Sequence, residues 1–98
     1  AEVSRFPAVI RDLALVVPHV QPLAPLLAGL RGAAPAIVRD VALFDVYQGK
    51  GLGESEKSLA FRIVMQDTQR TLEDAEVDAV IADLLLIARR DFNASLRA

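Results

Sequence analysis

The chain has 98 residues, 53% of them hydrophobic, with a single histidine, no cysteine and a formal net charge of -2. This length and apolar content suffice for one domain with its own core, without metal or disulfide staples. The lack of cysteine excludes thiol catalysis, cysteine-ligated zinc and a disulfide scaffold, and it suits a cytoplasmic protein. No apolar run approaches the roughly 20 residues of a membrane span, so we expect no membrane partner.

Acidic residues are concentrated in one segment. Five of the 13 acids fall between positions 73 and 83, where there is no Lys or Arg. The rest of the chain therefore sets 11 basic residues against eight acids and is mildly basic. Acids are favoured in the first turns of a helix, which explains Glu73, Asp74 and Glu76 without a binding role. The chain starts at Ala1 rather than Met, and we expect residues 1–98 to be a single domain excised from a longer protein.

The first half of the chain predicts a strand, a helix and a second strand. Residues 10–17 are rich in branched side chains and end at Pro18, which is typical of a mostly buried strand. Leucines at positions 23, 26, 27 and 30 then form the stripe of an amphipathic helix that ends near Gly32. Residues 36–47 predict the next strand.

The second half predicts the partner strand of a hairpin, a second helix and a closing strand. Glycines at positions 49, 51 and 53 separate residues 36–47 from the strand expected over 57–66, so the two strands should be antiparallel. Thr71 and Asp74 have the spacing of a helix cap, and the helix should run to about Arg89. Residues 94–97 predict a short edge strand.

This order predicts an α+β fold, the ferredoxin-like split βαβ sandwich (βαββαβ). Its four-stranded antiparallel sheet carries both helices on one face, so side-chain alternation decides what the other face presents. In the strand over 57–66, Phe61 belongs to the core side, so the outward residues are Ser58, Ala60 and Arg62. In the strand over 10–17, Leu15 belongs to the core side, so the outward residues are Asp12, Ala14 and Val16. In the strand over 36–47, Phe44 and Val46 are the better core pair, which turns Leu43, Asp45 and Tyr47 outward unless a bulge intervenes.

The open face offers groups that suit an unpaired nucleotide. The ring of Tyr47 can stack on a base, and Asp45 can accept a hydrogen bond from a base edge, as can Ser58. The alternative is structural: Tyr47 closes the hairpin, and Asp45 forms a surface ion pair with Arg62. Spacing by itself leaves both interpretations open.

The sequence offers few side chains that suit catalysis or metal binding. His19 lies between Pro18 and Val20, where a solvent-facing loop residue is expected and no triad can be assembled. Residues 49–58 resemble a phosphate loop superficially, but Glu56 replaces the glycine that such a loop needs before Lys-Ser, and a strand follows. Carboxylates do not cluster on the predicted open face, so we expect no metal site there.

Five ordered motifs carry a more specific resemblance. They are Phe6-Pro7 followed by residues 11–17, residues 43–47 with Gly49, residues 57–62, residues 70–72, and Ala94 with Leu96-Arg97. Over nearly its whole length the chain resembles the C-terminal ferredoxin-like anticodon-binding domain of the bacterial phenylalanyl-tRNA synthetase beta subunit.

The resemblance implies a non-catalytic module that binds the anticodon stem-loop of phenylalanine tRNA. The active site would lie in the alpha subunit of an α2β2 enzyme, together with ATP and magnesium, and this domain would hold no cofactor. The positions that match the family's RNA-binding pattern are Ala14, Asp45, Tyr47 and Ser58. Further candidates for phosphate contacts, chosen by charge, are Arg11, Arg39, Arg62 and Arg97.

Two other functions fit the same fold. An ACT-like regulatory domain shares the split βαβ layout and would bind an amino acid at a sheet interface between two copies. An acylphosphatase-like enzyme would need an anion-cradling loop after the first strand, and residues 18–22 do not supply one.

Overall fold

The computed structural model describes residues 6–97. Six elements follow in order: β1 (Val9–Pro18), α1 (Leu23–Ala33), β2 (Val38–Tyr47), β3 (Glu56–Met65), α2 (Asp74–Phe92) and β4 (Ser95–Leu96). The strands form one sheet in the order β2-β3-β1-β4, and each neighbouring pair is antiparallel. The predicted α+β, ferredoxin-like fold is confirmed, with element bounds within a few residues of those expected.

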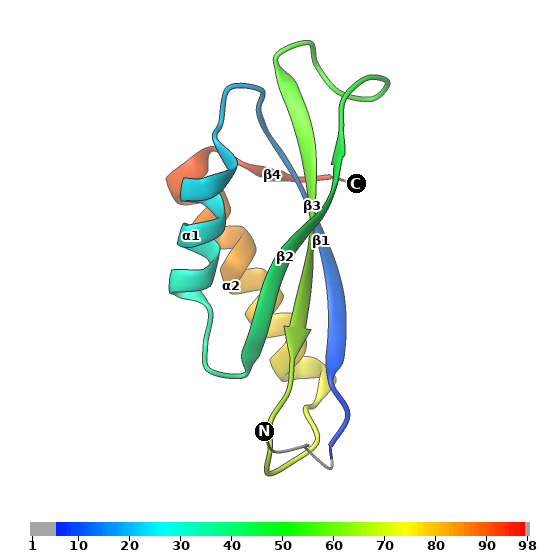
Figure 1. Ribbon diagram of the computed structural model, residues 1–98, viewed down its shortest axis with the longest axis vertical. Coiled ribbons are helices and arrows are strands. Elements are labelled where there is room, and N and C mark those ends of the chain that lie inside the picture. Colours follow the sequence, from blue (N-terminus) through cyan, green and yellow to red (C-terminus); the bar gives the residue numbers. More distant parts are fainter. Residues whose placement is uncertain (1–5, 98) are drawn as a thin grey trace.

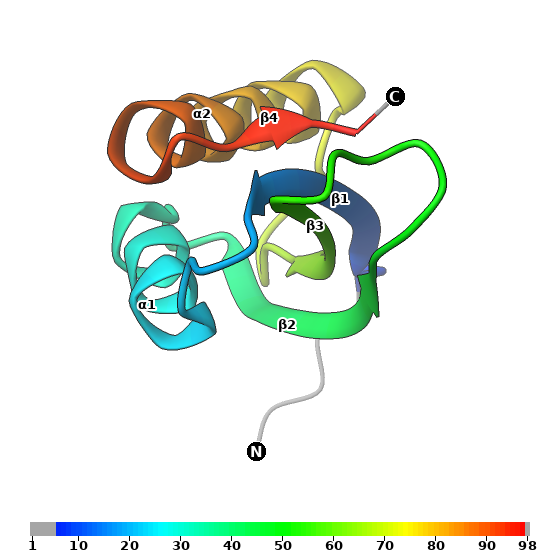
Figure 2. The ribbon, with the colours of Figure 1, turned by 90° about the horizontal axis from the view of Figure 1, so that it is seen from above.

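The two helices lie side by side against one face of the twisted sheet (Figure 1). The view from above shows that no described helix covers the other face, and that the connection between β2 and β3 projects on that side (Figure 2). We call this helix-free side the open face. Neither α1 nor α2 is long and apolar enough to cross a membrane.

The core fills the space between the sheet and the helices. The central strands contribute side chains that are at most 2% exposed, among them Leu13, Leu15, Leu59 and Phe61. Every second residue from Leu13 to Val17 in β1 and from Leu59 to Met65 in β3 takes part, as the alternation predicted. The helices supply the opposite wall: Leu26, Leu30, Val77, Val80, Leu84 and Ala88. This regular packing fixes which residues of β1 and β3 face outward.

The start of α2 differs from the expected Thr71 cap. The carboxylate of Glu76 accepts the backbone N–H of Glu73 at 2.7 Å and also pairs with the guanidinium of Arg70, where Nη2 lies 2.8 Å from Oε2. These hydrogen bonds, first from Arg70 and then from the Glu73 backbone, lower the pKa of Glu76 from its ordinary 4.5 to about 2. The helix therefore begins at Asp74, and Thr71 and Leu72 belong to the connection before it.

The end of α2 lies beyond the expected Arg89. Asn93 adopts a left-handed conformation (φ 54°), which asparagine tolerates, and the N–H of Ala94 reaches the carbonyl of Ala88. Phe92 packs against α1 so closely that a Cβ at Gly29 would lie 2.7 Å from two of its ring carbons. Because Ala94 closes the helix, β4 is shorter than the predicted strand over 94–97.

A β-bulge in β2 corrects part of the predicted alternation. Leu43 pairs with Phe61 and Asp45 pairs with Ala60, which leaves Phe44 without a partner in β3. Leu43 therefore packs against the core and Phe44 turns to the open face, the reverse of the expectation for both residues. Asp45 keeps its predicted side because the extra residue resets the alternation. Val46 shares the side of Leu59 but is 53% exposed, so it is not the core residue that we expected.

Candidate nucleic-acid interface

Strand register gathers the four motif-matched residues into one cluster. Tyr47 in β2 pairs with Ser58 in β3, and Asp45 pairs with Ala60. Ala60 pairs in turn with Ala14 of β1. Tyr47, Asp45, Ser58 and Ala14 thus lie on neighbouring positions of the open face, at the end of the sheet that carries the β2–β3 connection.

Tyr47 is held on two sides. Its hydroxyl donates to the carbonyl of Lys50 at 3.0 Å, which ties the ring to the β2–β3 connection. The guanidinium of Arg97 lies 4.4 Å from the ring centroid, a cation–π contact. Arg97 follows β4, so its side chain spans the two central strands to reach β2. The ring is half-buried, and its orientation is set by Lys50 in the β2–β3 connection and by Arg97 after β4.

Asp45 stands exposed beside this ring, and among residues 6–97 it forms no ion pair. Arg62, the partner expected in the structural alternative, instead places its Nε 3.2 Å from Oδ1 of Asp12. The predicted Asp45–Arg62 pair is therefore absent from the described part of the chain. The carboxylate of Asp45 keeps its capacity to accept hydrogen bonds from an incoming group.

Ser58 and Ala14 form the floor of the cluster. Ser58 is 2% exposed, although it points to the open face, and Ala14 is half-buried. Neighbouring residues therefore cover Ser58 in this structure. The small side chains of Ala14 and Ala60 keep the surface between β1 and β3 low.

The candidate arginines do not form a single group. Arg62 and Arg97 lie on the open face, where each covers an aromatic ring. Arg11 pairs with Ile63, on the helix side of the sheet, and its guanidinium lies 4.0 Å from Asp74 at the start of α2. Arg39 is the unpaired residue of a second irregularity in β2, and its Nε donates to the carbonyl of Gln66 at 3.0 Å. The open-face cluster therefore includes two of the four.

Phe44 is a surface aromatic that the alternation rule missed. It is 48% exposed and lies beneath the guanidinium of Arg62 at 4.5 Å from the ring centroid. The strand pattern is compatible with a bulge, but no residue type at this point marks which position of the strand is the extra one.

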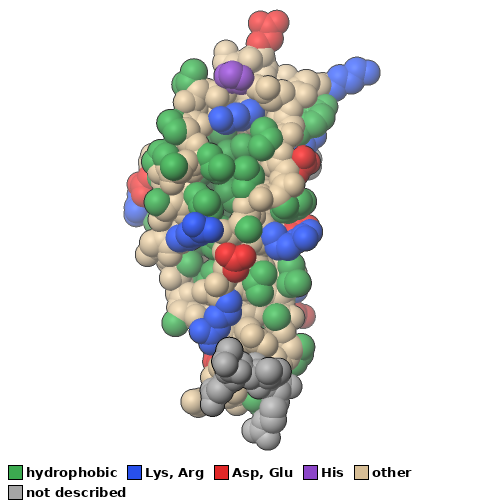
Figure 3. All heavy atoms as spheres, viewed as in Figure 1, with side chains coloured by type: hydrophobic (Ala, Val, Ile, Leu, Met, Phe, Trp, Pro, Cys, Tyr) green, Lys and Arg blue, Asp and Glu red, His purple; other side chains and the backbone are tan. Residues whose placement is uncertain are grey.

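Basic side chains in view are dispersed. On the surface seen in the orientation of Figure 1, Lys and Arg side chains alternate with apolar and acidic ones instead of forming a continuous basic patch (Figure 3). This matches the small excess of basic residues outside positions 73–83.

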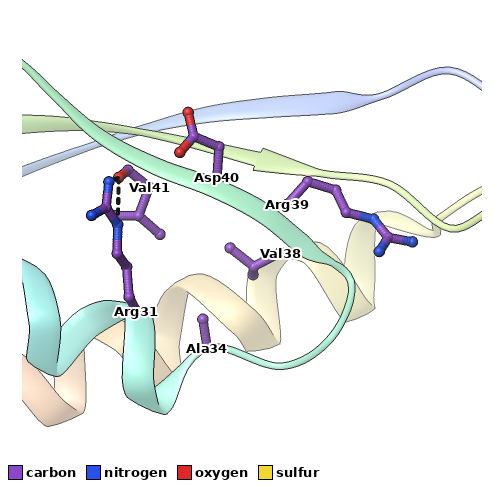
Figure 4. Close-up of a pocket in the computed structure, with 6 residues that line it drawn as sticks. All are labelled: Arg31, Ala34, Val38, Arg39, Asp40 and Val41. Carbon is purple, nitrogen blue, oxygen red and sulfur yellow. Dashed lines mark hydrogen bonds between the residues drawn. The ribbon is translucent and has the colours of Figure 1, made fainter. Parts of the chain in front are cut away.

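A hollow of about 230 Å³ lies at the edge of β2, away from the open-face cluster. Figure 4 shows Arg31 reaching from α1 to this edge, while Arg39 points away from it. Nε and Nη2 of Arg31 donate to the carbonyl of Val41 at 3.2 and 2.8 Å. The Val41 carbonyl is therefore already hydrogen-bonded and does not accept a bond from an added strand. This protects the edge of β2 from pairing with another chain.

The single histidine of the described residues lies in the loop that follows β1. His19 is exposed, as predicted, and its backbone N–H donates to Ser55 between two loops. Within residues 6–97, no group of three or more His, Asp or Glu side chains is arranged to hold a metal ion. The aromatic rings and their arginines are the chemically distinctive features of the described surface.

This combination defines a class of domain. An open antiparallel sheet that presents aromatic rings, a free carboxylate and low-profile small residues is a platform for unpaired bases. The sequence model of the ferredoxin-fold anticodon binding domain matches residues 4–97, and the chain belongs to this family. The domain is thus the anticodon-binding, non-catalytic type of module.

Similar proteins agree with this assignment. The chain is 58% identical over 98 residues to the phenylalanine--tRNA ligase beta subunit of Dechloromonas aromatica (strain RCB). It is 51% identical over 96 residues to the beta subunit of Aromatoleum aromaticum, and 48% identical over 96 residues to that of Haemophilus influenzae (strain KW20/Rd). These alignments cover 98 to 100% of this chain, which spans 12% of the length of each relative.

Proposed function

We propose that this chain recognises the anticodon stem-loop of phenylalanine tRNA on its open face, as a non-catalytic part of a phenylalanine–tRNA ligase. The observation that carries the proposal is the juxtaposition of Tyr47 and Asp45, a ring for stacking beside a carboxylate without an ionic partner in the described chain. A base that stacks on Tyr47 brings its edge within reach of Asp45, which accepts hydrogen bonds and so selects bases with amino or imino groups.

The proposal extends to the rest of the enzyme. The relatives are named as beta subunits of phenylalanine–tRNA ligase, and this supports a protein of the same kind that carries the domain, acts in the cytoplasm and pairs with an alpha subunit in an α2β2 assembly. ATP and magnesium would bind at its aminoacylation site, outside this domain.

A titration of the anticodon stem-loop into the isotope-labelled chain tests the proposal. We expect the backbone amide signals of Tyr47, Asp45 and their neighbours to shift, and those of the outer surface of α2 to stay in place. Tyr47→Ala should weaken binding by about 1 to 3 kcal/mol, the contribution of one stacked base. Tyr47→Phe keeps the ring and serves as the matched control, with a smaller loss from the bond to Lys50.

Two outcomes contradict the proposal. The first is unchanged affinity in Tyr47→Ala with an intact amide spectrum, which removes the stacking assignment. The second is dimerisation on addition of an amino acid together with indifference to the stem-loop, measured by sedimentation, which is the behaviour of an ACT-like regulatory domain.

A further inference from the structure

We propose that Phe44 and Arg62 form a second base-stacking site on the open face, which takes an unpaired nucleobase neighbouring the one that stacks on Tyr47. This inference rests on the proposed function, because it assigns a second contact to the same RNA. The sites assigned above by resemblance are Tyr47, Asp45, Ala14 and Ser58. The second site uses neither these residues nor a phosphate contact.

The exposure of Phe44 calls for a partner. A phenylalanine in a strand is ordinarily turned to the core, and here the bulge after Leu43 turns it outward and leaves it 48% exposed. The same bulge keeps Asp45 on the open face, so a single irregularity places a ring and a carboxylate side by side. Bulges commonly re-aim side chains next to functional sites.

Arg62, in β3, covers this ring and is held in place by a contact to β1. Its guanidinium lies 4.5 Å from the centroid of Phe44 in β2, and its Nε contacts Asp12 of β1 at 3.2 Å. A planar guanidinium layered on a ring is itself a surface on which a base can stack. With its side chain 48% exposed, Arg62 offers this surface to solvent while Asp12 restrains it.

The two aromatic sites have the same arrangement along β2. The guanidinium of Arg62 covers Phe44, and that of Arg97 covers Tyr47. The two rings are three residues apart, about 10 Å at the rise of a strand. Between the two rings the open face presents Asp45 and its β3 partner Ala60, whose methyl side chain leaves the surface low at that point. Sheet platforms that bind single-stranded RNA stack two or three bases on their aromatic residues. A strand of RNA that follows β2 therefore meets both sites with bases splayed from its loop.

The test uses a fluorescently labelled anticodon stem-loop of phenylalanine tRNA, intact and with each loop nucleotide made abasic in turn. Binding is compared among the 98-residue chain, Phe44→Leu, Arg62→Gln and Tyr47→Ala. Leu86→Ala serves as the matched control, because Leu86 is 59% exposed on α2 and distant from the open face.

We expect Phe44→Leu to weaken binding of the intact stem-loop by about fivefold or more, the loss of one stacked base. One abasic position should cost less affinity in Phe44→Leu than in the unmodified chain. That position should neighbour the one whose effect is reduced in Tyr47→Ala. Leucine retains apolar bulk at the bulge, so the fold is expected to persist, with the amide spectrum as the check.

The outcomes separate the two proposals. If the unmodified chain fails to bind the stem-loop, or Tyr47→Ala is silent, the proposed function is overturned. If both behave as expected but Phe44→Leu binds like Leu86→Ala, or loses affinity equally for every abasic RNA, the second site is overturned while the proposed function stands.

A measurement on the unmodified chain removes any dependence on how the variants fold. Side-chain signals of Arg62 and ring-proton signals of Phe44 should move when the stem-loop is added, because a base stacked on this pair shields the group that it covers. Unmoved Arg62 and Phe44 side-chain signals at saturation, alongside shifted Tyr47 signals, overturn the second site.

Discussion

The guanidinium of Arg97 lies 4.4 Å from the centroid of the Tyr47 ring, which joins the last described residue of the chain to the end of β2. The backbone N–H of Arg97 also donates to the carbonyl of Ala14 at 3.0 Å, so the residue is anchored beside β1 before its side chain crosses the sheet. The two-residue strand β4 thus has a role beyond closing the sheet. It delivers a cation to the ring at the centre of the candidate interface.

Arg97→Ala should reduce affinity for every stem-loop by a similar factor and lower the slope of log affinity against log salt by about 1, since one cation near the RNA backbone is lost. Arg97→Lys keeps the charge but not the planar layer on Tyr47. We expect it to retain the salt slope while losing part of the affinity. Fluorescence anisotropy at several salt concentrations measures both quantities, and a loss confined to one anticodon sequence would contradict the assignment.

Asp45→Asn replaces an acceptor-only carboxylate with an amide of the same size, so the fold should be unaffected. We expect it to lower affinity for the phenylalanine stem-loop and to reduce discrimination at one loop position by about 1 to 3 kcal/mol, because base contacts specify sequence. Competition with stem-loops that carry single base changes provides the measurement. Uniform weakening across all of these RNAs would mark Asp45 as a general electrostatic group instead.

Glu76 makes the stability of the domain depend on acid. Its pKa is lowered to about 2 by hydrogen bonds from Arg70 and the backbone of Glu73. A lowered pKa in the folded state means that the contribution is full above the ordinary value of 4.5 and is lost as the pH falls toward 2. Glu76→Gln should therefore flatten the decline in the free energy of unfolding between these pH values.

Denaturant unfolding at a series of pH values measures this slope. Arg70→Gln removes the charged partner of Glu76, whose hydrogen bond is the larger cause of the lowered pKa. It should therefore flatten the dependence of the free energy of unfolding on pH as well. A Glu76→Gln variant with the full slope of the unmodified chain would show that other carboxylates dominate its acid sensitivity.

Gly29 and Gly32 form a matched pair within α1. A methyl group at Gly29 meets the ring of Phe92 at 2.7 Å, whereas one at Gly32 meets nothing within 4 Å. Gly32→Ala should stabilise the domain by about 0.5 to 1 kcal/mol through helix propensity. Gly29→Ala gains the same propensity but forces α1 and α2 apart, and overpacking of this kind costs about 1 to 3 kcal/mol. Equal melting temperatures for the two variants would show that Phe92 moves aside without cost.

The candidate site was predictable where the alternation of a strand is uninterrupted. In β1 and β3, fully buried residues at every second position determine the side of Ala14, Ser58 and Arg62 without knowledge of the fold's details. Tyr47 and Asp45 were also assigned correctly, although through a strand whose upstream residues were placed on the wrong side. Their match to the family's motif provided independent support for the same face.

The position of the bulge in β2 could not be predicted from the residue types. Leu43 and Phe44 are both large and apolar, so either can be the buried one, and the choice depends on how β2 fits the register of β3. The arginine contacts have the same origin. Arg62 turned to Asp12 instead of Asp45 because β1 and β3 are paired in register at that point, a relationship of residues 50 positions apart.

The sequence by itself determined the order of the elements, the single apolar core and the outward side of the two central strands, because hydrophobic periodicity is a local property that each strand and helix carries in its own residues. Tertiary structure decided that Phe44 lies on the surface and that Arg62 and Arg97 each cover a ring. Those features depend on register and on which segments meet across the sheet, and such long-range geometry is set by the packing of the whole chain.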